Sequence, residues 1–188
     1  MGRWDPNARE RLERAALELF AEQGFAATTV PQITERAGLT TRTFFRYFSD
    51  KREVLFSGEE GMRSQFTAII EGAPPELSGL DLVQYALEQG AAAIFEPRFA
   101  DLRSWRAVVA SDEGLRERAL RKQELSTETA KTALRERGLD EQTATVLAGL
   151  ASVLLQSAVT AWVEQPVVEK SLTAYIRESV EQLRSLVA

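Results

Sequence analysis

The chain has 188 residues, of which 44% are apolar and 27% are charged, so it can form a packed core in water and is not expected to be disordered. It contains no cysteine and no histidine, which excludes disulfides, zinc fingers, cysteine or serine–histidine nucleophile pairs and imidazole metal ligands. The net charge of −5 is uneven, because residues 1–57 carry nine basic and eight acidic side chains and no acid lies between Arg36 and Ser49. This part of the chain is therefore compatible with a phosphate-bearing partner.

The helical period of apolar residues occurs along the whole chain, whereas the alternation that predicts strands does not. The first helix is expected between Asn7, which with Glu10 resembles a capping box, and Gly24, which ends it. The sequence thus predicts an all-α protein.

Two short helices on either side of a glycine turn follow. The first covers residues 30–37 and is expected to begin at a capping box formed by Thr29 and Gln32, and the second covers about 41–48. Gly38 between them supplies the positive φ of a tight turn. This spacing is typical of a helix-turn-helix, although an ordinary helical bundle is about equally compatible with it. The apolar residues expected to form its core are Leu19, Phe20, Ile33, Leu39 and Phe44.

Further helices are expected along the rest of the chain. Ser49 and Asp50 begin a fourth helix that runs to about Ile70, and residues 72–79, with two prolines and two glycines, form the clearest linker. The later helices are expected over about 80–95, 98–110, 112–137, 140–165 and 168–186.

The uncharged stretch 142–163 is long enough to suggest a membrane span. Its glutamine, serine and threonine side chains, and the flanking Glu141 and Glu164, instead favour a buried helix of a soluble bundle. The N-terminus has no apolar export segment, so a cytoplasmic protein without a membrane partner is expected.

The second short helix presents chemistry that suits DNA. Arg42 can pair bidentately with guanine, and Thr41 or Thr43 can reach a base edge or a thymine methyl. Phosphate contacts, which set the register of a protein on DNA, suit Thr29, Tyr47 and Lys51.

Residues from about Arg9 to Leu55 resemble the DNA-binding domain of the TetR/AcrR family of transcriptional regulators. The motifs that carry the resemblance are Leu-Phe-Ala-Glu-Gln-Gly-Phe at 19–25, Thr-Thr-Val at 28–30, Ala-Gly-Leu at 37–39, and Phe-Phe-Arg-Tyr-Phe at 44–48 followed by a lysine. The resemblance implies a three-helix DNA-binding head over residues 1–55 and a six-helix effector-binding and dimerisation body over 56–188. It also implies a homodimeric repressor that leaves a palindromic double-stranded DNA operator when a small molecule binds.

The same resemblance implies which side chains contact DNA. Contacts from the recognition helix are expected at Thr41, Arg42, Thr43, Phe45 and Tyr47, and phosphate contacts at Thr29, Thr40 and Lys51. Phe45 departs from the family pattern, which often has tyrosine there, so it is expected to touch a thymine methyl or to pack.

The resemblance implies a homodimer built by the last two helices, and a dimer is also expected because a helix-turn-helix reads palindromes in pairs. Its apolar candidates are Leu147, Leu150, Val153, Leu154, Tyr175, Ile176, Val180 and Leu183. An ordinary core within one chain is the alternative interpretation.

An effector pocket is expected among aromatic and aliphatic side chains of the body. The candidates are Phe66, Ile70, Tyr85, Phe95, Phe99, Trp105, Val109, Leu154 and Trp162. Core packing is again the alternative, and the scarcity of polar groups favours an apolar or amphipathic ligand. Residues 111–118 faintly resemble bodies associated with acyl-CoA-like ligands, although a solvated helix face explains their arginines equally well.

Two other classes of function are weighed against a regulator. Paired acids such as Asp112-Glu113 lie near helix starts, where they favour the helix dipole, and no phosphate loop or metal cluster occurs, so an enzyme is not expected and neither is a cofactor. A ligand carrier without DNA would leave Thr41, Arg42 and Lys51 without a purpose.

Overall fold

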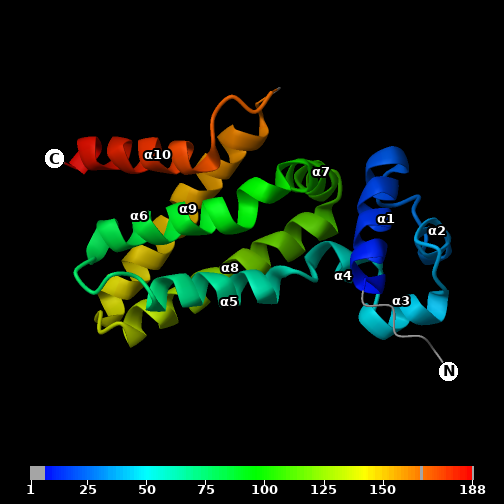
Figure 1. Cartoon of the computed structure of the whole chain (residues 1–188), viewed down its shortest axis with the longest axis horizontal. Coiled ribbons are helices and arrows are strands. Elements are labelled where there is room, and N and C mark those ends of the chain that lie inside the picture. The colour runs from blue at the N-terminus through cyan, green and yellow to red at the C-terminus, as the bar shows by residue number, and fades with distance from the viewer. Residues whose placement is uncertain (1–6, 166, 188) are drawn as a thin grey trace. The chain divides into compact units, whose positions relative to one another are not determined.

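The structure is a computed structural model that describes residues 7–165 and 167–187, and every regular element in those residues is a helix (Figure 1). The all-α prediction is thereby confirmed. The chain divides into two compact units, of which the first runs to Glu59 and includes Arg103–Ala119. The second comprises Glu60–Leu102 and the residues from Leu120 onward.

The first unit is built on four N-terminal helices, which are α1 (Ala8–Gln23), α2 (Val30–Arg36), α3 (Thr41–Tyr47) and α4 (Lys51–Phe56). Phe20, Ile33 and Phe44 lie at the centre of its core and are at most 2% exposed. The predicted small core is confirmed, with Leu39 packed at its edge. Val108 and Leu115, from the ends of α7 (Phe99–Ala110) and α8 (Glu113–Glu136) that belong to this unit, complete it.

Side-chain caps begin three of these four helices. The capping box of Thr29 and Gln32 is present, Thr40 accepts a hydrogen bond from the backbone N–H of Thr43, and Asp50 caps α4. The capping box predicted at Asn7 is wrong, because its backbone (φ −105°, ψ 9°) lacks the extended conformation from which a side chain can cap a helix.

The predicted single helix from Asp50 to Ile70 is also wrong. Helix α4 ends at Phe56 and α5 (Glu59–Glu71) begins after Ser57 and Gly58. Glycine disfavours a helix interior, and the Ser57 hydroxyl is held by the carboxylate of Glu13 and the carbonyl of Val54. The interruption therefore depends on a contact with α1 as well as on local sequence.

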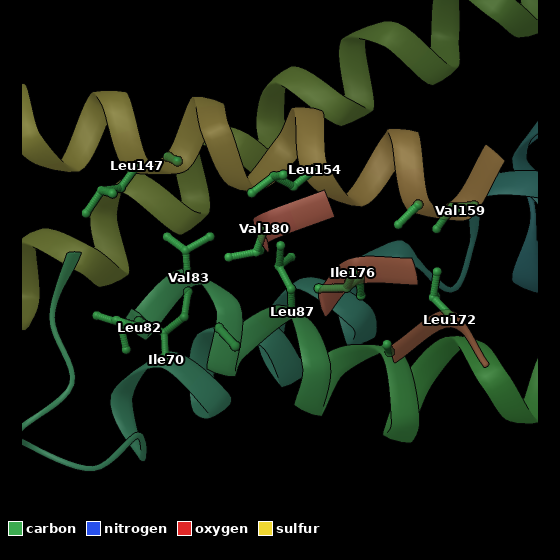
Figure 2. Packing of buried hydrophobic residues seen from close by; sticks show 14 of the residues in the cluster. Ile70, Leu82, Val83, Leu87, Leu147, Leu154, Val159, Leu172, Ile176 and Val180 are labelled. Carbon is green, nitrogen blue, oxygen red and sulfur yellow. The ribbon is translucent and has the colours of Figure 1, made fainter. Parts of the chain in front are cut away.

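The second unit contains α5, α6 (Gly79–Gly90), α9 (Glu141–Val163), α10 (Leu172–Val187) and the remaining parts of α7 and α8. Apolar side chains from α6, α9 and α10 converge in its core (Figure 2). Leu82, Ile176 and Val180 are completely buried there. This core is what orders the long apolar helix α9, which is the one helix in the described part of the chain with the length and hydropathy of a membrane span.

The helix predicted over 80–95 changes character before it ends. A π-helical turn at Ala91–Phe95 and a 3₁₀ turn at Glu96–Arg98 separate α6 from α7. At Gly90 a Cβ atom would lie 2.3 Å from the ring of Phe66, so glycine permits this ring to approach the helix backbone. The irregular segment carries Glu96 and leads directly to Phe99, both of which line a pocket described below.

Candidate nucleic-acid interface

Helix α3 is held by its buried aromatic residues and not by its own length. Phe44 and Phe48 are 0% and 2% exposed, with ring centroids 5.3 Å apart. Seven residues are too few for a stable isolated helix, so this packing fixes the orientation of α3. Gly38 has φ +63° as predicted, and the guanidinium of Arg11 binds the carbonyl of Ala37 beside it.

The opposite side of α3 presents polar and flat groups to solvent. Thr41, Arg42 and Arg46 are exposed, as is Phe45, whose ring is 56% exposed. Thr43 and Tyr47 are half-buried. The hydroxyls of Thr43 and Thr40 are 3.0 Å apart, and Arg46 donates to the Tyr47 hydroxyl at 2.8 Å. All five recognition-helix residues predicted from the sequence thus lie on α3, a helix that carries no acidic side chain.

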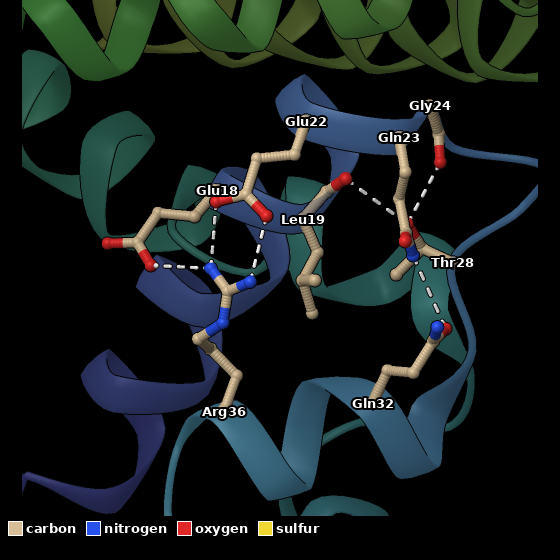
Figure 3. A network of polar contacts seen from close by, with 8 residues as sticks. All are labelled: Glu18, Leu19, Glu22, Gln23, Gly24, Thr28, Gln32 and Arg36. Atoms are coloured by element: carbon tan, nitrogen blue, oxygen red, sulfur yellow. Dashed lines mark hydrogen bonds and ion pairs between the residues drawn. The ribbon is translucent and has the colours of Figure 1, made fainter.

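The basic side chain of α2 is already paired. Arg36 donates to both carboxylate oxygens of Glu22 at 2.8 and 2.9 Å and lies near Glu18 (Figure 3). These hydrogen bonds raise the pKa of Arg36 and lower the pKa of Glu22. Its charge is therefore locally neutralised, which distinguishes it from Arg42.

A buried hydroxyl organises the connection between α1 and α2. Thr28 is 1% exposed. Its hydroxyl donates to the carbonyl of Gly24 at 2.8 Å, lies 3.3 Å from the carbonyl of Leu19, and accepts a hydrogen bond from the amide of Gln23 (Figure 3). The amide of Gln23 also reaches Gln32 of the capping box. Sequence reasoning missed Thr28, because its position beside the Thr29 cap gave no sign that it would be buried.

Lys51, the first residue of α4, also faces this connection. Its ammonium donates to the carbonyls of Phe25, Thr28 and Ala26 at 2.7, 2.8 and 3.3 Å, and lies 4.3 Å from the centroid of the Phe25 ring. Partial burial lowers the pKa of Lys51, against a smaller opposing effect of Asp112. Of the three residues predicted to contact phosphate, Lys51 therefore has hydrogen-bond partners within the protein. Thr29 and Thr40 lie at the exposed starts of α2 and α3.

The predicted effector residues fall into three groups. Phe99 and Trp162, whose rings meet edge to face, line a pocket of about 320 Å³ together with Glu96 and Val168–Ser171. Trp105 and Val109 belong to the core of the first unit. The remaining candidates pack in or against the core of the second unit, as the alternative interpretation had it: Phe66, Ile70, Tyr85, Phe95 and Leu154. Sequence reasoning missed Glu96 and 168–171, because only the fold brings them beside Trp162.

The predicted interface residues divide by burial within the single chain. Four of them are at most 7% exposed and pack in the core of the second unit, namely Leu147, Leu154, Ile176 and Val180 (Figure 2). Three more are half-buried, namely Leu150, Tyr175 and Leu183, and the last, Val153, is exposed. The large apolar side chains that α9 leaves exposed are Val146 (55%) and Val153 (63%).

Helix α3 follows a glycine turn, packs its apolar side against the core and exposes basic and hydroxyl groups on the other side. This arrangement defines a helix-turn-helix protein.

Residues 13–57 match the family model described as "Bacterial regulatory proteins, tetR family". The HTH-type transcriptional regulator TcmR of Streptomyces glaucescens is 44% identical over 66 residues, which are 35% of this chain and 29% of that protein. HbdR of Aromatoleum sp. (strain CIB), another HTH-type transcriptional regulator, is 42% identical over 48 residues, which are 26% of this chain and 21% of that protein. These matches span less than a third of either relative's length.

Solved structures resemble almost the whole chain. A putative TetR-family transcriptional regulator from Syntrophomonas wolfei has a TM-score of 0.65 at 15% identity, with 96% of this chain and 95% of that chain covered. SmeT, the repressor of the Stenotrophomonas maltophilia multidrug efflux pump SmeDEF, has a TM-score of 0.62 at 19% identity, with coverages of 95% and 89%. The family model over residues 13–57, the curated relatives and the shared fold together support a regulator of the TetR/AcrR family.

Proposed function

We propose that the protein is a sequence-specific, DNA-binding transcriptional repressor that acts as a homodimer and leaves a palindromic operator when a small molecule binds. The observation that carries the proposal is the exposed side of α3, where Arg42 and Phe45 are exposed on a helix that a buried aromatic core holds in place. DNA binding is assigned to residues 1–55, and effector binding and dimerisation to residues 56–188. The site of action is then the cytoplasm.

Direct base contacts are assigned to the exposed side of α3. Arg42 suits a guanine, Thr41 and Thr43 suit base edges, and the exposed ring of Phe45 suits a thymine methyl. Thr29, Thr40 and Tyr47 are assigned to phosphates, which set the register. Hydroxyl groups at the exposed starts of α2 and α3 support this division.

A second copy of the chain is assigned to the outer side of α9. Val146 and Val153 are two helical turns apart and therefore lie on the same side, with Gly149 and the half-buried Leu150 between them. Exposed apolar groups on an ordered helix favour a covered surface, and a helix-turn-helix protein reads its two half-sites as a pair. The other side of α9 packs against α6 and α10 in the core of the second unit. This packing fits a dimer better than a membrane span.

The effector is assigned to the pocket at Phe99 and Trp162. The two aromatic rings favour an apolar or amphipathic ligand, such as an acyl-CoA-like molecule. The buried indole N–H of Trp162 has no hydrogen-bond partner among the described residues, which supports a ligand that carries an acceptor. SmeT, whose fold is similar, has been solved as a complex with triclosan, with a TM-score of 0.64 at 21% identity over 95% of this chain and 90% of that one.

Selection of genomic DNA fragments by the purified full chain tests the proposal. We expect enrichment of a palindrome, binding that weakens steeply as salt rises, and release by an apolar or amphipathic compound from a screened set. Failure of the dimer to enrich any sequence would contradict a sequence-specific regulator.

A further inference from the structure

The ammonium group of Lys51 is directed at the main chain of its own protein. Its three hydrogens have three carbonyl acceptors, at Phe25, Ala26 and Thr28, so the donor capacity of the side chain is used. The ring of Phe25, which is 6% exposed, lies beneath the charge at 4.3 Å. A phosphate that approached this ammonium would have to displace one of the three carbonyls.

The acceptors of Lys51 lie in the connection between α1 and α2. Residues 24–29 connect α1 to α2 and include Ala26 and Ala27, which have no polar side chain. Thr28 fixes the connection from the α1 side through the carbonyls of Leu19 and Gly24. Lys51 fixes the connection from the α4 side. One of its acceptors is the carbonyl of Thr28, which directly precedes Thr29, the N-cap residue of α2.

We infer that Lys51 is a positioning residue, which ties the first turn of α4 to the connection between α1 and α2 and thereby sets where α2 begins beside α3. It acts on DNA binding through the placement of Thr29 and α2, and its charge does not neutralise a phosphate. The effect of Lys51 on DNA binding depends on the function proposed above, whereas its tie to the connection between α1 and α2 does not.

The two roles differ in what a salt titration measures. Each phosphate contact that is lost lowers the slope of log K against log salt by about 0.9, because one fewer counterion is released on binding. Loss of a positioning contact weakens binding but leaves the number of neutralised phosphates, and therefore the slope, unchanged. The two roles also predict different results for replacement of Lys51 by arginine. Arginine binds phosphate well, but it cannot direct three hydrogens from one nitrogen at converging carbonyls.

The experiment compares the full-length wild type with Lys51→Met and Lys51→Arg, and uses Arg42→Gln as the charge-removing control. Hydrogen exchange over residues 25–33 is measured without DNA, and salt titrations use the duplex that the wild type selects. We expect exchange in this segment to be faster by about tenfold in both Lys51 variants, as the loss of hydrogen bonds to a charged group implies. We also expect both variants to bind the duplex about tenfold more weakly at the wild-type slope. Arg42→Gln should flatten the slope, because it removes a positive charge that is held against the DNA and therefore displaces a counterion.

Each result decides for or against the positioning role. Faster exchange in 25–33 with an unchanged salt slope supports it. If Lys51→Arg binds with wild-type affinity and Lys51→Met shows a flattened salt slope, Lys51 contacts a phosphate and the positioning role is overturned. Unchanged exchange overturns the tie between α4 and the connection even if DNA binding changes. A wild type that selects no duplex counts against the proposed function alone, since the exchange measurement still decides on Lys51.

Discussion

Arginine side chains on the first unit differ in their partners, and this difference predicts which of them reads DNA. Arg36 is paired with two glutamates and Arg46 with the Tyr47 hydroxyl, whereas Arg42 is exposed on α3. We expect Arg42→Ala to weaken binding to the selected duplex by about 1–3 kcal/mol and to relax the preference at one base pair in each half-site. Affinities for all single-base variants of the duplex measure this. Arg36→Ala is the matched control, and an unaltered preference in Arg42→Ala would assign base reading to another residue.

The close approach of Phe66 to α6 gives a second test at the scale of one residue. A Cβ at position 90 would lie 2.3 Å from the Phe66 ring, so Gly90→Ala must displace this ring from its contact with Phe95. We expect a loss of about 1–2 kcal/mol in the free energy of unfolding, measured in urea, because overpacking outweighs the better helix propensity of alanine. Gly61→Ala in α5, where a Cβ meets nothing within 4 Å, is the control and should not destabilise the protein. Equal stability of both variants would show that the ring moves at no cost.

At the scale of elements, local signals and long-range contacts explain what the sequence could predict. The capping box at Thr29 and the positive φ at Gly38 depend on neighbouring residues, so α2, α3 and the turn between them were predicted nearly to the residue. The interruption between α4 and α5 depends on Ser57 meeting Glu13, and the partners of Lys51 lie 23 to 26 residues away along the chain. Such contacts carry no periodic signal, which is why the exposed side of α3 was predictable and the bonds of Lys51 were not.

Helix α9 begins at Asp140, whose carboxylate accepts hydrogen bonds from the backbone and the hydroxyl of Thr143 at 3.0 and 2.6 Å. These bonds lower the pKa of Asp140 below its ordinary value of 3.8. A lowered pKa in the folded state adds stability above the unfolded value, and this stability is lost as the pH falls through the folded value. We therefore expect wild type to be more stable than Asp140→Asn at neutral pH, and the difference to shrink below about pH 4. Urea unfolding at a series of pH values measures it, and a constant difference would show that the charge does not contribute.

At the scale of the whole molecule, the proposed dimer makes DNA binding depend on the outer side of α9. Leu147 and Leu154 are buried within one chain, so the second copy in the proposed dimer is expected to meet the exposed Val146 and Val153. We expect Val146→Asp combined with Val153→Asp to produce a monomer in sedimentation experiments, because two carboxylates would otherwise be buried without partners. The monomer should retain helical content but bind a single half-site weakly, since the two half-sites are no longer held together. Val167→Asp, at a 67% exposed position outside the helix, is the control and should remain dimeric. A double variant that stays dimeric and binds DNA normally would contradict an interface on this side of α9.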